Sequence, residues 1–309
     1  MMAFQIDIDL DGNVAVVFVS PWVVKTVHFS YLQVRDKTSD DKTDKFKDPW
    51  GNYKKSLIHH IPRPQATNPF VAARKGHPAN NIGEVVRSVP YVAQDGWPPE
   101  GTEILALKYH LPLQLMTPLT KEARYIYVAR NPKDACVSYY YFLQNLPGYK
   151  FERFDEFFDA FVEGELPYGD FFDHVADWVS VRHQPNVLIV TYESLHKDRR
   201  RVVADIADFI GIRLDASTLE DVLRYSSFEF MRDLARKDNF MENYLRASTS
   251  RSRSAAPSDD KRPVMMRRGI VGDWRNLLSP EQSRTLDKML EEKVPDMMDT
   301  WRDAISGYF

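Results

Sequence analysis

Arg130 and Ser138 lie in the stretch YIYVARNPKDACVSYYYF (residues 125–142), where an apolar strand pattern changes into a helical one. Asn131 and Pro132 are typical of a helix cap and of a first helical position, so Arg130 should end the strand and Ser138 should lie on the helix. In open α/β sheets, ligands bind outside the carboxyl ends of the strands, and the N-terminus of a helix favours an anion. The segment therefore predicts an anion site.

A second basic segment, MRRGIVGDWRNL (residues 266–277), contains Arg267, Arg268 and Gly269. Guanidinium groups match the oxygens of a phosphate in pairs, and glycine lets the backbone approach a ligand closely. Each basic segment also has a plain alternative explanation. Arg130 could form a surface ion pair with Asp134, and the second segment could be a solvated basic turn.

These residues need a sheet and helices to bring them together, and the sequence predicts both. Short apolar runs alternate with helical patterns, which is typical of a single α/β domain with a mostly parallel central sheet flanked by helices. Strands are expected over residues 14–19, 102–110, 123–130 and 186–193. Helices are expected over residues 132–145, 154–164 and 199–210, and from Pro280 onward.

Two of these helices carry clear end signals. Gly211 follows the pattern of residues 199–210 and is a typical C-terminal stop. Ser279 and Gln282 have the spacing of a capping box around Pro280. Loops are expected over residues 35–48, 89–101 and 246–263, and the last of these has the composition of a flexible segment.

Composition excludes several functional classes. Cys136 is the only cysteine of the 309 residues, so an intrachain disulfide and a cysteine zinc site are both excluded. The net charge is −3 with mixed signs throughout, which gives no general reason to expect nucleic-acid or membrane binding. The acidic N-terminus does not resemble a signal peptide, and no apolar run is long enough to span a bilayer. We expect a cytoplasmic protein.

Together the two basic segments resemble the 3'-phosphate-binding signatures of the cytosolic sulfotransferases, which use 3'-phosphoadenosine 5'-phosphosulfate (PAPS). The resemblance extends over LALKYHLPLQL (105–115), IVTYESL (189–195) and YSSFEFM (225–231), in the family's order. It covers residues 102–300, whereas residues 1–101 diverge. It implies one sulfotransferase domain over residues 1–309, with an architecture similar to that of P-loop NTPases.

Carried over by position, the resemblance assigns two groups of residues to the donor nucleotide. The 3'-phosphate would contact Arg130, Ser138, Arg267, Arg268 and Gly269. The adenine would contact Tyr192, Ser226 and Phe228. For the two aromatic residues, ordinary core packing is the commoner role.

The resemblance also assigns residues to the sulfuryl-transfer step. His110 matches the general base, and Lys108 and Lys25 match the cations that face the leaving group, with Ser138 beside them. Lys25 and Thr26 belong to a divergent 5'-phosphosulfate loop. A gapped match gives Phe29 the role of the family's tryptophan.

Val24 and Val27 stand where the family's loop has proline and glycine. A β-branched residue suits a close-approach position poorly. This divergence leaves two functions open. The first is an enzyme that transfers the sulfuryl group of PAPS to a hydroxyl or amine of a small aromatic or apolar acceptor, without a metal, and releases 3'-phosphoadenosine 5'-phosphate (PAP).

The second is a weakly active or inactive homologue that binds the nucleotide as a binding or regulatory protein. A kinase is disfavoured because the chain lacks a glycine-rich loop and an evident magnesium-binding set.

The usual dimer motif of the family would lie over residues 276–284, where Pro280 and Arg284 replace a valine and an acid. We expect a monomer, or a dimer that does not use this motif.

Overall fold

The computed structural model describes residues 15–19, 106–110, 112–116, 118–119, 121, 123–144, 151–211, 213–236 and 267–306. For residues 15–19, 106–109, 115 and 303–306 it describes the backbone only. Lys25, Thr26 and Phe29 lie outside these residues, as do the three predicted loops.

Four described strands form one parallel sheet. The strands are β1 (Ala15–Val19), β2 (Ala106–Tyr109), β3 (Ala123–Ala129) and β4 (Val187–Thr191). Their order is β2-β1-β3-β4, and every neighbouring pair is parallel. This confirms the predicted sheet.

The register brings three functional segments to one edge of the sheet. Val19, at the end of β1, pairs with Tyr109 on one side and with Tyr127 on the other. His110 directly follows β2 and Arg130 directly follows β3, so both stand at the carboxyl edge. The chain that leaves β1 toward residue 20 starts from the same edge, between them.

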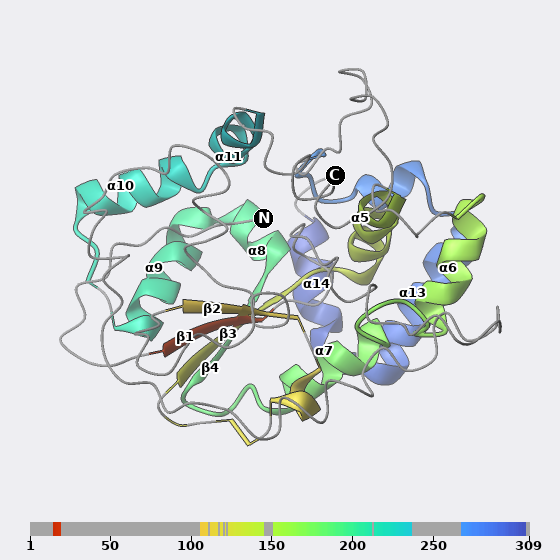
Figure 1. Ribbon diagram of the computed structural model, residues 1–309, viewed down its shortest axis with the longest axis horizontal. Helices are drawn as coiled ribbons and strands as arrows, with labels where there is room; N and C mark the ends of the chain where they lie inside the picture. The colour runs from red at the N-terminus through yellow and green to blue at the C-terminus, as the bar shows by residue number, and fades with distance from the viewer. Residues whose placement is uncertain are drawn as a thin grey trace, which may run out of the picture.

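Helices cover both faces of the sheet (Figure 1). One group contains α5 (Pro132–Gln144), α6 (Phe154–Val162), α7 (Phe171–Ser180), α13 (Pro280–Lys293) and α14 (Met298–Ser306). The other contains α8 (Tyr192–Lys197), α9 (Arg199–Ile210), α10 (Ala216–Tyr225) and α11 (Phe228–Arg236). Short 3-10 turns η2 (Leu113–Leu115), η4 (Asp273–Asn276) and η5 (Pro295–Met297) complete the described elements.

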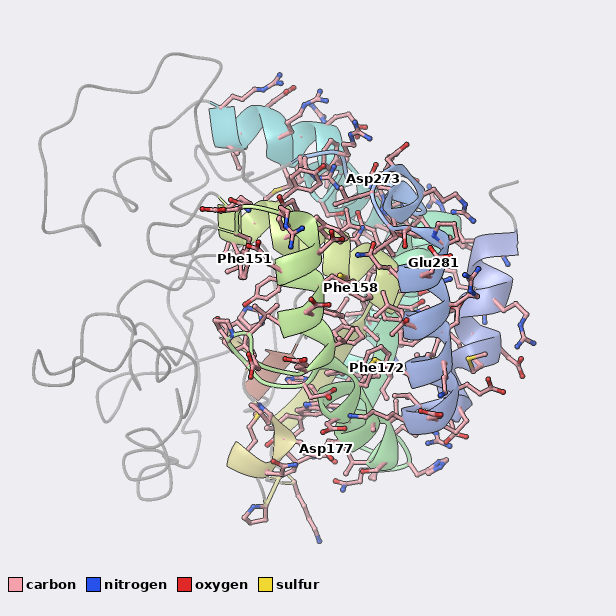
Figure 2. All side chains as sticks on the ribbon, turned by 90° about the vertical axis from the view of Figure 1, so that its right-hand side faces the viewer. Phe151, Phe158, Phe172, Asp177, Asp273 and Glu281 are labelled. Carbon is pink, nitrogen blue, oxygen red and sulfur yellow. The ribbon has the colours of Figure 1, made fainter. Side chains whose placement is uncertain are left out.

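The alternation of β3 creates two apolar cores. Tyr125 and Tyr127 face the larger core, which contains the phenylalanines of α6 and α7, and Ile126 faces a smaller core formed with α9 and α10. Figure 2 shows Phe158 and Phe172 among the helices of the larger core. Successive strand residues point to opposite faces, so a strand buried on both faces reads as nearly continuous apolar sequence.

The predicted helix ends are confirmed. Gly211 ends α9 in the left-handed conformation, with φ of 82°. Ser279 and Gln282 form a capping box at the start of α13. One strand prediction is wrong at its end, because Thr191 and Ser194 form a capping box and start α8 at Tyr192, so that residues 192–193 are helical rather than extended.

Candidate active site

Arg130 is buried at the carboxyl end of β3, with 7% of its surface exposed. Its Nη2 donates a hydrogen bond to the carbonyl oxygen of Ile270 at 3.2 Å, and its guanidinium lies 4.3 Å from the ring centre of Tyr192. Its Nε is buried and has no hydrogen-bond partner among the described residues. Burying a charged donor without a hydrogen-bond partner costs free energy of folding. The Nε of Arg130 is therefore a candidate donor to a bound ligand.

Helix α5 starts immediately after Arg130 because Asn131 caps it. The Asn131 side chain accepts a hydrogen bond from the backbone N–H of Lys133 at 3.0 Å. Ser138, the second predicted residue of this segment, lies buried on the same helix. The cap confirms how the sequence starts this helix, which begins just after Arg130 and carries Ser138.

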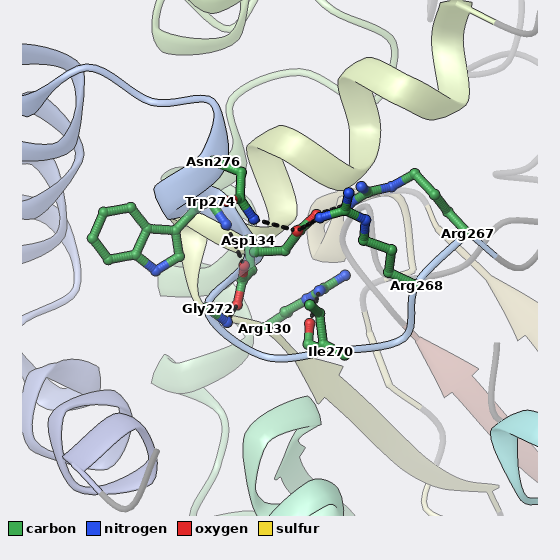
Figure 3. Close-up of polar contacts among 9 residues, drawn as sticks. Arg130, Asp134, Arg267, Arg268, Ile270, Gly272, Trp274 and Asn276 are labelled. Carbon is green, nitrogen blue, oxygen red and sulfur yellow. Dashed lines mark hydrogen bonds and ion pairs between the residues drawn. The ribbon is translucent and has the colours of Figure 1, made fainter. Parts of the chain in front are cut away.

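Asp134 connects α5 to the second basic segment (Figure 3). Its carboxylate accepts backbone hydrogen bonds from Gly272 at 2.6 Å and from Trp274 at 3.1 Å. Asp134 is almost fully buried, so the alternative of a surface ion pair with Arg130 is wrong. The long-range contact brings residues 267–277 beside the end of β3.

Arg267 and Arg268 both form ion pairs with Asp273, whose carboxylate is 3% exposed. The Arg268 contact measures 2.7 Å, and Asn276 donates to the same carboxylate at 3.0 Å. Burial would raise the pKa of Asp273, but the hydrogen bonds from Arg267, Asn276 and Arg268 lower it overall. Asp273 therefore stays ionised and holds two guanidinium groups side by side, as Figure 3 shows.

The backbone of Gly269 packs directly against the ring of Phe228. Its φ is 67°, and a Cβ at this position would collide with the Phe228 ring. Ser226 ends α10 two residues earlier, and its buried hydroxyl has no hydrogen-bond partner among the described residues. Gly269, Ser226 and Phe228 thus form a second small cluster, at the start of α11.

Tyr192 joins this region to Arg130. Its ring contacts the Arg130 guanidinium and also the ring of His196, with ring centroids 4.5 Å apart. Burial, Arg130 and Arg199 lower the pKa of His196 to about 4, so this imidazole is neutral at physiological pH.

His110 directly follows β2 at the carboxyl edge of the sheet and is 3% exposed. The carbonyl oxygen of His110 is 3.2 Å from Nε2 of His174, and Nδ1 of His174 is 3.1 Å from the Tyr127 hydroxyl. Both contacts are satisfied together when His174 is neutral with its proton on Nε2. The ring of Tyr168 lies 5.7 Å from that of His110.

The structure thus links Arg130 with Tyr192, Arg267 with Arg268, and Gly269 with Phe228 in neighbouring segments. Lys108 lies on β2, next to His110, with only its backbone described. Sequence reasoning missed Glu193, His174 and Asp273, which contact the predicted residues rather than forming a motif of their own. The acidic Glu193, at the last position of the apolar strand predicted over residues 186–193, was the one local signal available.

No described helix is long and apolar enough to cross a membrane. Within the same residues, no three histidine, cysteine or acidic side chains are grouped so that they could hold a metal ion.

Comparison with known proteins identifies the family. The sequence model of the sulfotransferase domain matches residues 100–298, well over half of the chain. A 3-beta-hydroxysteroid sulfotransferase of Cavia porcellus is 36% identical over 203 residues, which are 63% of this chain and 66% of the relative. Human sulfotransferase 2A1 is 34% identical over 191 residues, which are 61% of this chain and 63% of the relative. The matches thus span less than two thirds of these relatives.

Solved structures agree on the fold. The mouse sulfotransferase SULT7A1 complexed with PAP has a TM-score of 0.59 at 24% identity, covering 99% of this chain and 94% of that chain. A retinol dehydratase in a complex with retinol and PAP has a TM-score of 0.59 at 20% identity, covering 93% of this chain and 83% of its own. The sheet, the helices on both faces and the family match all lead to one conclusion: the chain belongs to the sulfotransferase domain family.

Proposed function

We propose that this protein transfers the sulfuryl group of PAPS to a hydroxyl or amine of a small acceptor and releases PAP. The observation that carries the proposal is a pair of buried hydrogen-bond donors without partners among the described residues: Arg130 Nε at the end of β3, and Ser226 Oγ two residues before Phe228. A phosphorylated nucleoside offers oxygens for the first and a polar base for the second. Relatives of this fold are known complexed with PAP, which supports the same ligand here.

The residues fit the donor in two groups. Arg130 and Ser138, with Arg267, Arg268 and Gly269, would hold the 3'-phosphate, and the two arginines paired with Asp273 would supply paired donors to its oxygens. Tyr192, Ser226 and Phe228 would hold the adenine. Phe228 keeps its position only because residue 269 has no side chain.

His110 would act as the general base in the transfer step. It would take the proton of the acceptor as a bond forms between the acceptor oxygen or nitrogen and sulfur, while the bond between sulfur and the 5'-phosphate oxygen breaks. PAPS supplies the activated sulfuryl group. Lys25 and Lys108 would neutralise the charge that builds on the leaving phosphate, with Ser138, Thr26 and Phe29 completing the donor contacts. The step requires no metal.

The acceptor would be aromatic or apolar. His110 lies next to Tyr168, and its carbonyl oxygen contacts His174, which in turn contacts Tyr127; this aromatic setting favours apolar molecules over charged ones. The steroid sulfotransferases among the relatives, and the retinol-bound structure, are consistent with acceptors of this kind. We further propose one domain over residues 1–309, a cytoplasmic location, and a monomer or a dimer outside the usual motif.

Calorimetric titration with PAP, followed by an assay of sulfate transfer to mixed phenols and steroid alcohols, tests this function. Binding and turnover together support a transferase. PAP binding without turnover of any acceptor would support the nucleotide-binding homologue instead, for which Val24 and Val27 in the phosphosulfate loop are the observation in favour. No PAP binding would overturn both.

A further inference from the structure

Glu193 is a fully buried carboxyl group, 0% exposed, at the start of α8. Its Oε1 accepts a hydrogen bond from the backbone N–H of Asn131 at 2.9 Å. Asn131 lies between Arg130 and the first residues of α5, which it caps. Glu193 is therefore fixed to the peptide unit that connects Arg130 to α5.

The second oxygen of this carboxyl group, Oε2, is buried and has no hydrogen-bond partner among the described residues. An ionised carboxylate in such a place is poorly solvated on one side. Burial raises the pKa of Glu193 to about 7, against the opposing effects of the Asn131 amide and of Arg130, and Asp134 raises it further. The group therefore changes charge near neutral pH.

The charged groups around Glu193 come from few elements. Arg130 acts on it from the end of β3, and Asp134 acts on it from α5. Helix α9 packs on α8 through buried apolar residues, and its charged residue Arg199 acts on His196. On α14, which also packs on α8, Asp299 and Arg302 pair with each other at 2.9 Å.

We propose that Glu193 is a positioning residue for the donor nucleotide, which holds the Arg130 turn through Asn131 and takes up a proton when the 3'-phosphate binds. The proposal rests on the proposed function, because it takes PAP as the ligand of Arg130. Glu193 is fully buried and acts on the ligand through Arg130 and the Asn131 peptide.

The direction of the coupling follows from charge. Without nucleotide, the positive charge of Arg130 favours the ionised form of Glu193. A bound phosphate brings negative charge to Arg130 and offsets this effect, so the neutral form of Glu193 becomes more favourable. Binding then draws a proton from solvent, and the affinity for PAP weakens as the pH rises above 7.

Proton uptake is measured directly by titrating PAP at pH 7.5 in HEPES and in Tris, two buffers that differ in ionisation enthalpy. We expect the wild type to take up on the order of half a proton more per nucleotide than Glu193→Gln. Glutamine can still accept the Asn131 hydrogen bond, so a purely structural role would leave proton uptake unchanged. Glu165→Gln, at an exposed position, is the matched control and should behave as wild type.

The titration separates this inference from the proposed function. PAP binding with equal proton uptake in wild type and Glu193→Gln would overturn the role of Glu193 and leave the function intact. Failure of the wild type to bind PAP would overturn both. The wild type also gives a test without any variant, because its PAP affinity must fall between pH 7 and pH 8.5, and a constant affinity would contradict the proposal.

Discussion

Two regions at the carboxyl edge of the sheet differ in the side chains that form them: charged groups dominate one, and aromatic rings dominate the other. Around Arg130 the contacts are ionic and long-range: Asp134 holds residues 272–274, and Asp273 pairs with Arg267 and Arg268. The region around His110 is aromatic: the His174 ring contacts the His110 carbonyl oxygen, and the Tyr168 ring lies beside the His110 ring. We call them the charged half and the aromatic half.

Under the proposed function, the difference predicts that donor binding and acceptor chemistry are separable in this fold. A phosphate needs fixed positive charge, which the charged half offers through the buried Arg130 and through Arg267 and Arg268, both held by Asp273. In the proposed mechanism, the general base needs a titratable group beside the acceptor, and His110 in the aromatic half would supply it. Variants in the charged half should change nucleotide affinity, and variants in the aromatic half should change turnover alone.

The largest effect is expected for His110→Ala. Loss of a general base should lower the rate of sulfate transfer by about 10²–10⁴-fold and leave PAP affinity unchanged. Steady-state transfer and PAP titration measure the two quantities. His183→Ala, at an exposed histidine, is the control. An active His110→Ala enzyme would remove His110 from the mechanism.

The charged half should also have a pH-dependent stability that arises from Glu193. The pKa of Glu193 is raised from 4.5 to about 7, so the folded state binds more protons than the unfolded state between these values. Stability from this group is complete below about pH 4.5 and is lost as the pH rises through 7, by on the order of 3 kcal/mol at most.

Glu193→Gln should therefore gain stability relative to wild type as the pH rises from 5 to 8. Urea unfolding at several pH values measures this difference. A stability difference that stays constant with pH would show that Glu193 does not titrate in the folded protein. Glu165→Gln should give no pH-dependent difference.

Arg130→Ala tests the charged half at its centre. Removing charge-assisted bonds to the 3'-phosphate should weaken PAP binding by about 2 kcal/mol, roughly 30-fold, and Arg130→Lys should recover part of this loss. Arg267→Ala should behave similarly. The exposed Arg153, which pairs with Glu156, provides the control Arg153→Ala. Unchanged PAP affinity in Arg130→Ala would show that the 3'-phosphate is held elsewhere.

The smallest effect is expected for Tyr127→Phe in the aromatic half. The substitution removes the hydroxyl that contacts Nδ1 of His174, so the tautomer of this ring is no longer fixed from that side. Nε2 of the same ring contacts the His110 carbonyl oxygen. Loss of one such hydrogen bond costs about 1 kcal/mol, so turnover should fall several-fold. PAP affinity should stay the same, and a parallel loss of PAP affinity would contradict the separation of the two halves.

Local signals predicted the four described strands and helices α5, α6, α9 and α13, but not α7, α10, α11 or α14. Gly211 and the Ser279 capping box marked helix ends because their effects act within a few residues. The alternation of β3 and the cap at Asn131 placed Arg130 at the sheet edge for the same reason. Helix α8 was missed because its capping box begins inside the predicted strand of residues 186–193.

Long-range contacts could not be predicted in the same way. Asp134 lies four residues after Arg130 in sequence, which suggested a local ion pair, yet its hydrogen bond to Gly272 spans 138 residues. The contact of Glu193 with Asn131 spans 62 residues and depends on how β3 and β4 pair. The roles of Lys25, Thr26 and Phe29 stay predictions.

The central claim is that the charged half recognises a 3'-phosphate, and a comparison of two nucleotides tests it most directly. PAP and 5'-AMP share the adenine, the ribose and the 5'-phosphate and differ only in the 3'-phosphate. Calorimetric titration of the wild type should give an affinity for PAP at least about 30-fold higher than for 5'-AMP, equivalent to about 2 kcal/mol. Equal affinities would contradict the assignment of Arg130, Arg267 and Arg268 to the 3'-phosphate.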